Sequence, residues 1–209
     1  MGNNQVYKNR ALASLEGKWG KAIIATLIMA IVTGGIGDVL GIPFMSSQWT
    51  GMGVQGIWAI ITMPFAWAWA VYFLRLIRNE DLDYGHLLDG YKQFGRILLA
   101  EILITIAVFI GFLLLIVPGI IIALMLSQTD FILKDDREIS AIDAMARSIK
   151  LMDGHKVELF WLTLSFIGWA ILSLLTLGIG FLLLAPYYES AAAHFYEDLK
   201  AEEANEVIA

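Results

Sequence analysis

The chain has 209 residues, of which 58% are hydrophobic and 16% are charged, and its mean hydropathy is +0.70. Soluble domains carry about 25% charged residues, so this composition excludes an ordinary water-soluble protein. The absence of cysteine excludes disulfides, thiolate metal sites and cysteine nucleophiles. The net charge of −6 at pH 7 says little about orientation in a membrane, because orientation follows the positions of Lys and Arg.

The apolar residues gather in blocks, several of which have the length of about 20 residues that crosses a bilayer as a helix. We predict an all-α transmembrane bundle of about six helices in three hairpins, with spans at 22–41, 55–77, 97–117, 119–133, 158–176 and 179–196. Glycines and Asp38 interrupt the first span, which could therefore be short or re-entrant, and the fourth span is brief. Four spans with two half-helices is the alternative.

The basic residues fall into groups that alternate along the chain. All fourteen lie before the first span, between spans two and three, between spans four and five, or after span six. The other connections, 34–53, 118–119 and 176–180, contain none, as the positive-inside rule requires for hairpins closed on the outside. We therefore expect a multi-pass protein of the cytoplasmic (inner) membrane with both termini in the cytoplasm.

A short motif recurs where the chain enters the membrane. An apolar residue, an acid and a glycine stand at 15–17, 88–90 and 152–154, and Lys21, Arg96 and Lys156 follow them. The glycines are 73 and 64 residues apart, which suits one hairpin plus one surface segment. We predict a single membrane domain, 1–209, built from degenerate repeats at about 12–77, 85–133 and 140–199.

Each repeat is expected to begin with an amphipathic helix on the cytoplasmic face. The clearest starts at Ser140, a plausible N-cap with Asp143 three residues later. It places four apolar side chains on one face, those of Ile142, Met145, Ile149 and Met152. This pattern is typical of an interfacial helix, and a helix packed on another part of the protein is the alternative.

The connections on the outer side are predicted to be short turns. Pro118-Gly119 closes the second hairpin and Leu177-Gly178-Ile179-Gly180 closes the third. Proline lacks an N–H group and glycine tolerates unusual backbone angles, which limits unsatisfied backbone groups in a dry place. Only the first loop, 34–53, is long enough to extend outward.

Several local patterns resemble a known family. They are Phe94-Gly95-Arg96, Val117-Pro118-Gly119-Ile120, Leu151-Met152-x-Gly154-His155-Lys156, Leu175-Thr176-Leu177-Gly178-Ile179-Gly180 and Phe195-Tyr196-Glu197-Asp198-Leu199. With them the chain resembles, from Leu12 to Leu199, the DUF975 family of bacterial integral membrane proteins. The resemblance implies a prokaryotic membrane protein without settled function or catalytic residues to transfer. The family is distantly similar to the membrane domain of some glycerophosphodiester phosphodiesterases.

Ionisable residues within spans are costly and raise a functional question. One hypothesis is a polar cavity at the inner ends of spans three, four and six, lined by Glu101, Gln128, Asp130, Glu189 and His194. The alternative, which we favour, is that each acid reaches the interface and pairs with Arg96, Lys134 or Lys156. Residues expected to contact lipid headgroups are Lys21, Arg96, Arg147, Lys150, His155 and Lys156.

The chain carries no G-x-S-x-G, H-E-x-x-H or Walker motif, and we predict no catalytic residue, metal or cofactor. The favoured function is a non-enzymatic module that organises or regulates lipid or a partner protein at the cytoplasmic face. A small transporter or lipid-handling carrier is the second hypothesis, and an intramembrane enzyme acting on lipid headgroups is the third. Expected partners are membrane lipids, with a protein partner or a second copy of the chain possible and nucleic acid excluded.

Overall fold

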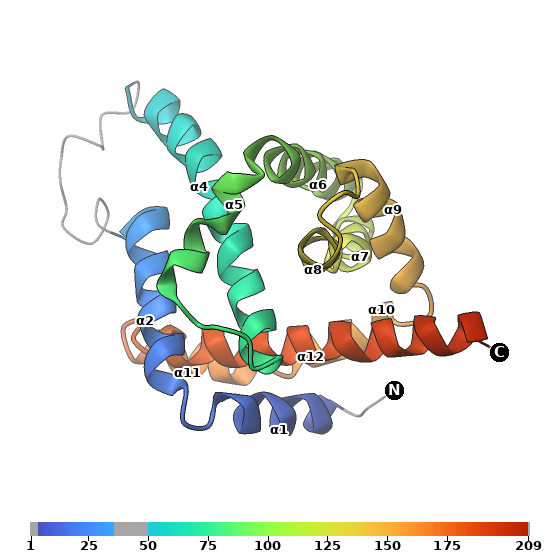
Figure 1. The fold of residues 1–209 in the computed structure, drawn as a ribbon. Coiled ribbons are helices and arrows are strands. Elements are labelled where there is room, and N and C mark those ends of the chain that lie inside the picture. Colours follow the sequence, from blue (N-terminus) through green and yellow to red (C-terminus); the bar gives the residue numbers. More distant parts are fainter. Residues whose placement is uncertain (1–3, 36–49, 209) are drawn as a thin grey trace.

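The computed structural model describes residues 4–35 and 50–208, and the regular structure in these ranges is helical (Figure 1). The first half contains α1 Asn4–Leu15, α2 Trp19–Ala30, the π-helical turn η1 Ile31–Gly35, α4 Thr50–Ile77, the 3-10 turn η3 Tyr84–Leu88 and α5 Asp89–Lys92. The second half contains α6 Phe94–Leu114, α7 Ile116–Leu126, α8 Thr129–Asp135, α9 Ala141–Leu151, α10 Lys156–Leu164, α11 Ile167–Leu175 and α12 Phe181–Ile208. The all-α prediction is confirmed.

Four helical segments are long and apolar enough to cross a membrane. They are Gly56–Ile77, Phe94–Leu114, Ile116–Asp135 and Lys156–Leu175. They correspond to the second, third, fourth and fifth predicted spans. The first predicted span is a shorter apolar helix, Trp19–Thr33, within the described residues, and the sixth lies in α12, which is long but more polar. Four candidate spans are thus found, and full crossing by the first and sixth stays a prediction.

The hairpin of α6 and α7 turns earlier than we predicted. Leu115 is extended, with φ −165° and ψ 158°, and separates the two helices, whereas Pro118 and Gly119 already belong to α7. Proline fits the first turn of a helix because an N–H group there has no partner within the helix. Gly119 instead allows close packing, since a Cβ there would lie 2.5 Å from the ring of Phe112.

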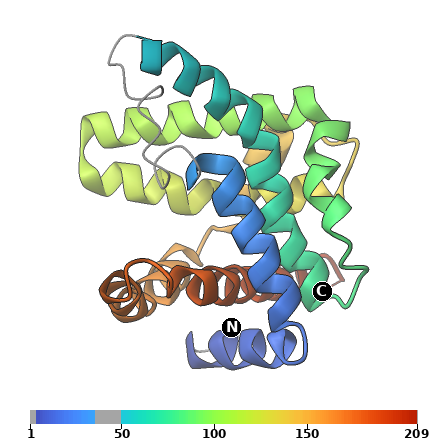
Figure 2. The ribbon, with the colours of Figure 1, turned by 90° about the vertical axis from the view of Figure 1, so that its left-hand side faces the viewer.

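Helix α12 runs across the direction of the α6–α7 hairpin. Figure 1 shows α12 along its length and α6 and α7 nearly end-on, whereas Figure 2 shows α6 and α7 along their length. On one side α12 packs against α1, with Phe195 of α12 in edge contact with Tyr7. On another side Tyr196 packs on Phe131 of α8. α12 therefore joins the N-terminal helix to the core between α4, α6, α8 and α9.

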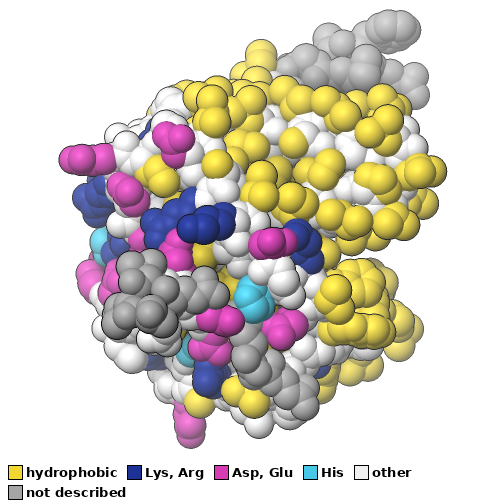
Figure 3. All heavy atoms as spheres, turned by 90° about the vertical axis from the view of Figure 1, so that its right-hand side faces the viewer, with side chains coloured by type: hydrophobic (Ala, Val, Ile, Leu, Met, Phe, Trp, Pro, Cys, Tyr) yellow, Lys and Arg dark blue, Asp and Glu magenta, His cyan; other side chains and the backbone are white. Residues whose placement is uncertain are grey.

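Apolar and charged side chains occupy different parts of the surface. On the face shown in Figure 3, hydrophobic side chains cover one side and the charged ones gather on the other. The tip of the α6–α7 hairpin is especially apolar: Leu113, Leu114, Leu115 and Ile116 are each 69–76% exposed. Exposed apolar area of this extent is typical of a surface that faces lipid.

The three repeated glycines have two different roles. Gly17 and Gly154 have positive φ, +73° and +81°, and each lies in the turn between a surface helix and an apolar helix. Gly90 has no such angle, but a Cβ there would lie 2.0 Å from the carbonyl oxygen of Pro64. The first and third motifs thus share a turn geometry that the second lacks, and the repeat boundaries stay a prediction.

Candidate functional site

Arg78, which directly follows the last residue of α4, forms several hydrogen bonds with acidic side chains. Its guanidinium donates two hydrogen bonds to Asp135, of 2.6 and 2.9 Å, and one of 2.8 Å from Nε to Glu197. Lys200 and Tyr196 also donate to Asp135, at 2.6 and 3.0 Å. The hydrogen bonds with Asp135 raise the pKa of Arg78, more than burial lowers it. These contacts tie α4, α8 and α12 together, and our sequence reasoning missed them.

Arg96, a predicted headgroup contact, points into the protein. Its guanidinium donates to three backbone carbonyls at and after the end of α8, those of Leu133, Asp136 and Ile139, at 2.6–2.9 Å. A cation at this position satisfies carbonyls that lack a partner within the helix and complements the helix dipole. Arg96 therefore has a structural role, and its contact with lipid stays a prediction.

Three of the predicted cavity residues, which are partly buried, lie close to one another. The carboxyl groups of Glu101 and Asp130 lie within hydrogen-bonding reach of each other, and Glu189 lies close enough to Asp130 to interact electrostatically. Asp130 Oδ1 is shielded from solvent and has no hydrogen-bond partner. These acids come from α6, α8 and α12, so only the tertiary structure brings them together.

The expected pairing of these acids with cations is not found in the part of the chain that the structure describes. Arg96 binds carbonyl groups, Lys134 lies 3.8 Å from Glu80, and Lys156 binds Asp153 at 2.8 Å. The predicted pairing of the acids with Arg96, Lys134 or Lys156 is therefore wrong, because each of these cations contacts another group.

The other two predicted cavity residues have separate surroundings. Gln128 is 1% exposed; its Nε2 donates to Ser127, and its Oε1 has no hydrogen-bond partner. His194 Nε2 lies 2.8 Å from the hydroxyl of Ser14, on the side of α12 that faces α1. The structure therefore does not place His194 with the three acids, and a cavity lined by all five residues stays a prediction.

Helix α9 begins as predicted. The Ser140 hydroxyl accepts from the Asp143 N–H at 3.1 Å and donates to its carboxylate at 2.6 Å. The buried face consists of three small residues and the last residue of the helix, namely Ala141, Ala144, Ser148 and Leu151. Ile142 and Ile149, on the face that we predicted to be apolar, are 65% and 39% exposed. Of the other two residues on the predicted face, Met145 is partly buried and Met152 is buried, so Ile142 and Ile149 are the two that remain uncovered.

The remaining predicted headgroup contacts differ in their bonding. Lys21 and Lys150 are exposed, and no ion pair includes them within the described residues. Arg147 donates to Glu203 at 2.8 Å, and this hydrogen bond raises its pKa. His155 Nδ1 lies 3.6 Å from Glu158, and its Nε2 lies 3.8 Å from Glu202.

In the described part of the chain, no group of three or more His, Asp or Glu side chains is arranged to hold a metal ion. The groups that the site does offer are the three neighbouring carboxyls, the ion pairs around Arg78 and the exposed apolar side chains of α9.

Comparison with known proteins identifies the second half of the chain. Residues 106–203 match the family model described as a protein of unknown function (DUF975). This match supports the resemblance to the DUF975 family. The DUF975 region contains Asp130, Glu189, α9 and His155, whereas Glu101 and the first helices precede it. No curated protein and no solved structure matches the chain, and the similarity to glycerophosphodiester phosphodiesterases is not shown.

Proposed function

We propose that the protein is a non-enzymatic membrane module that engages the phospholipid headgroup layer through its charged side, with α9 as the contacting element. The exposed apolar face of α9 carries this proposal. Ile142 and Ile149 lie about two turns apart on a helix whose opposite face is already packed. Burying a side chain of this size is worth about 1.5–3 kcal/mol, which favours contact with lipid over contact with water.

The surroundings of α9 support the same proposal. Lys150, in its last turn, is exposed and has no ion pair within the described residues, so it can meet a lipid phosphate. The candidate span Lys156–Leu175 begins five residues after α9 ends. A helix so close to the start of a span lies at headgroup depth if that span crosses the bilayer.

Single cysteines test this proposal, because the native chain has none. A polarity-sensitive fluorophore at Ile142→Cys or Ile149→Cys, in proteoliposomes, is expected to emit at blue-shifted wavelengths and to be quenched by brominated lipid. Glu138→Cys is the matched control, since this residue is exposed, polar and two residues before the N-cap. Emission at the wavelengths seen in water, from the labels at both α9 positions, would contradict the proposal.

A small carrier is the second candidate, and the three acids favour it. Glu101, Asp130 and nearby Glu189 have no cation paired with them within the described residues. A carrier needs water to reach these groups. Glu189→Cys should then react with a small charged thiol reagent in intact proteoliposomes or after permeabilisation. Failure to react under both conditions, while Glu138→Cys reacts, eliminates the carrier.

A further inference from the structure

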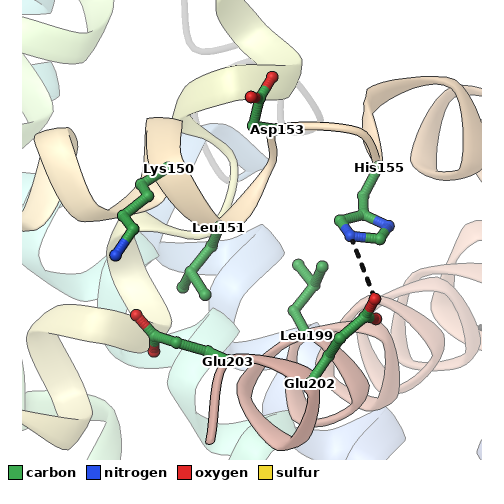
Figure 4. A pocket seen from close by; sticks show the side chains of 7 residues that line it. All are labelled: Lys150, Leu151, Asp153, His155, Leu199, Glu202 and Glu203. Carbon is green, nitrogen blue, oxygen red and sulfur yellow. Dashed lines mark ion pairs between the residues drawn. The ribbon is translucent and has the colours of Figure 1, made fainter. Parts of the chain in front are cut away.

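A small pocket lies where α9 ends and the chain turns into α10, and the C-terminal part of α12 closes it (Figure 4). It is lined by Lys150, Leu151, Asp153, His155, Leu199, Glu202 and Glu203, and its volume is about 70 Å³. A water molecule needs about 10–15 Å³ on the same measure. The pocket therefore has room for a group of a few heavy atoms, such as an ammonium or a phosphate.

The pocket lies next to a surface that suits lipid. His155 immediately precedes Lys156, the first residue of the candidate span Lys156–Leu175. Val157 and Trp161, in the first turns of α10, are 64% and 54% exposed. A charged pocket beside an uncovered apolar helix is suited to a ligand with a polar head and an apolar body.

His155 and Glu202 have unused hydrogen-bonding capacity. Hydrogen bonds between such groups measure about 2.7–3.2 Å, whereas His155 Nε2 lies 3.8 Å from Glu202 and Nδ1 lies 3.6 Å from Glu158. His155 Nδ1 is also shielded from solvent and has no hydrogen-bond partner. The imidazole is thus held near two carboxylates without a full bond to either.

Two of the charges around the pocket are already paired. Glu203 binds Arg147 at 2.8 Å, and Asp153 binds Lys156 at 2.8 Å. Lys150 and Glu202 remain as the charged lining residues without a close partner in the described part of the chain. Figure 4 shows Lys150 on one side of the pocket and the His155–Glu202 pair on the other. The open charges are therefore one cation and one anion, separated across the pocket.

We propose that this pocket binds a phosphate ester that carries a primary amine, as in the phosphoethanolamine headgroup. Lys150 faces the phosphate, and Glu202 accepts hydrogen bonds from the ammonium. His155 lines the pocket beside Glu202. A primary ammonium has three N–H donors, and a quaternary ammonium has none to satisfy Glu202. The proposal rests on the proposed function, since it names the lipid class that the charged side selects.

The test uses the full chain in nanodiscs and measures retained lipid by native mass spectrometry. Phosphatidylethanolamine is compared with phosphatidylcholine and with phosphatidylglycerol, which lack a primary amine. We expect a preference for phosphatidylethanolamine of about tenfold, equivalent to one hydrogen bond to a charged group. Soluble glycerophosphoethanolamine, added to protein in phosphatidylcholine nanodiscs, tells a headgroup site from one that also needs the acyl chains.

Two variants remove the proposed contacts, and two neighbouring residues serve as controls. Glu202→Gln should reduce the preference to nearly one, because it removes the acceptor for the ammonium. Lys150→Gln should weaken the retention of all three lipids, because each of them carries a phosphate. Glu138→Gln and Arg137→Gln remove the same charges from exposed positions without a side-chain bond in the described structure, and they should leave the preference unchanged. Equal retention of the three lipids by the native chain, or an unchanged preference in Glu202→Gln, would overturn the proposal.

The outcome can be separated from that of the proposed function. If α9 labels report water but glycerophosphoethanolamine still competes with bound lipid and Glu202→Gln abolishes the competition, the pocket is right and the insertion of α9 is wrong. If α9 labels report lipid and retention shows no preference for the amine, the insertion stands and the pocket proposal fails.

Discussion

Arg78 shows how one side chain can hold several helices on the charged side. Its planar guanidinium binds Asp135 with two parallel bonds, a geometry that Lys cannot reproduce. Asp135 in turn accepts from Lys200 and Tyr196, so each of its oxygens has a donor. The side chains of Arg78 and Asp135 are only 21% and 14% exposed, which limits screening by water.

We expect Arg78→Met to lower the free energy of unfolding by roughly 1–3 kcal/mol, because it leaves partly buried carboxylates without their main donor. Thermal unfolding in detergent, followed by circular dichroism, measures this loss. Arg137→Met is the control, since Arg137 is exposed and has no bond in the described structure. Equal unfolding temperatures for the two variants would contradict the role of Arg78.

The surroundings of the Asp89 carboxyl lead us to expect that stability depends on pH. Burial raises the pKa of this carboxyl, but hydrogen bonds from Lys92 and His86 together hold it below the usual 3.8. A carboxyl with a lowered pKa contributes stability above its unfolded pKa and loses it as the pH falls through both values. The stability difference between the native chain and Asp89→Asn should be constant from about pH 7 to 5 and shrink below about pH 4. A difference that grows on acidification would refute this assignment.

At the scale of elements, the turns at Gly17 and Gly154 orient a surface helix relative to the apolar helix that follows. Gly154→Ala should destabilise the protein by about 1–2 kcal/mol, the cost of a left-handed angle for a residue with a Cβ, although the space around it is open. Gly56→Ala is the control: it lies within α4 with nothing nearby and with no positive φ. It should be neutral or stabilising by up to about 1 kcal/mol, because alanine favours a helix.

The α9 helix illustrates what periodicity can and cannot predict. The capping pattern and the apolar face at Ile142 and Ile149 could be predicted from sequence, since both depend on residues a few positions apart. That Ala141, Ala144 and Ser148 form the buried face could not, because small residues become a packing surface only where another helix approaches. In α9, Ser148 donates to the Met125 carbonyl at 2.7 Å, a contact between distant segments.

At the scale of the whole molecule, the separation of charged and apolar surfaces leads to a test of orientation. Glu138→Cys should react with an impermeant maleimide only after the cells are permeabilised. Leu177 lies in the turn before α12 and is 95% exposed, so Leu177→Cys should react from outside. Ser47→Cys, in the predicted outer loop, should also react from outside, although this loop lies outside the described residues. The reverse pattern would overturn the proposed topology.

The sequence by itself determined the helical class, four of the apolar segments, the start of α9 and the turn glycines at 17 and 154. These features depend on local composition, on hydrophobic blocks and on backbone angles that favour glycine. Only the tertiary structure decided which charges meet: Arg96 with the end of α8, Arg78 with Asp135 and Glu197, and Glu101 with Asp130. These partners lie at least 29 residues apart, and the packing of the helices, which no local pattern encodes, brings them together.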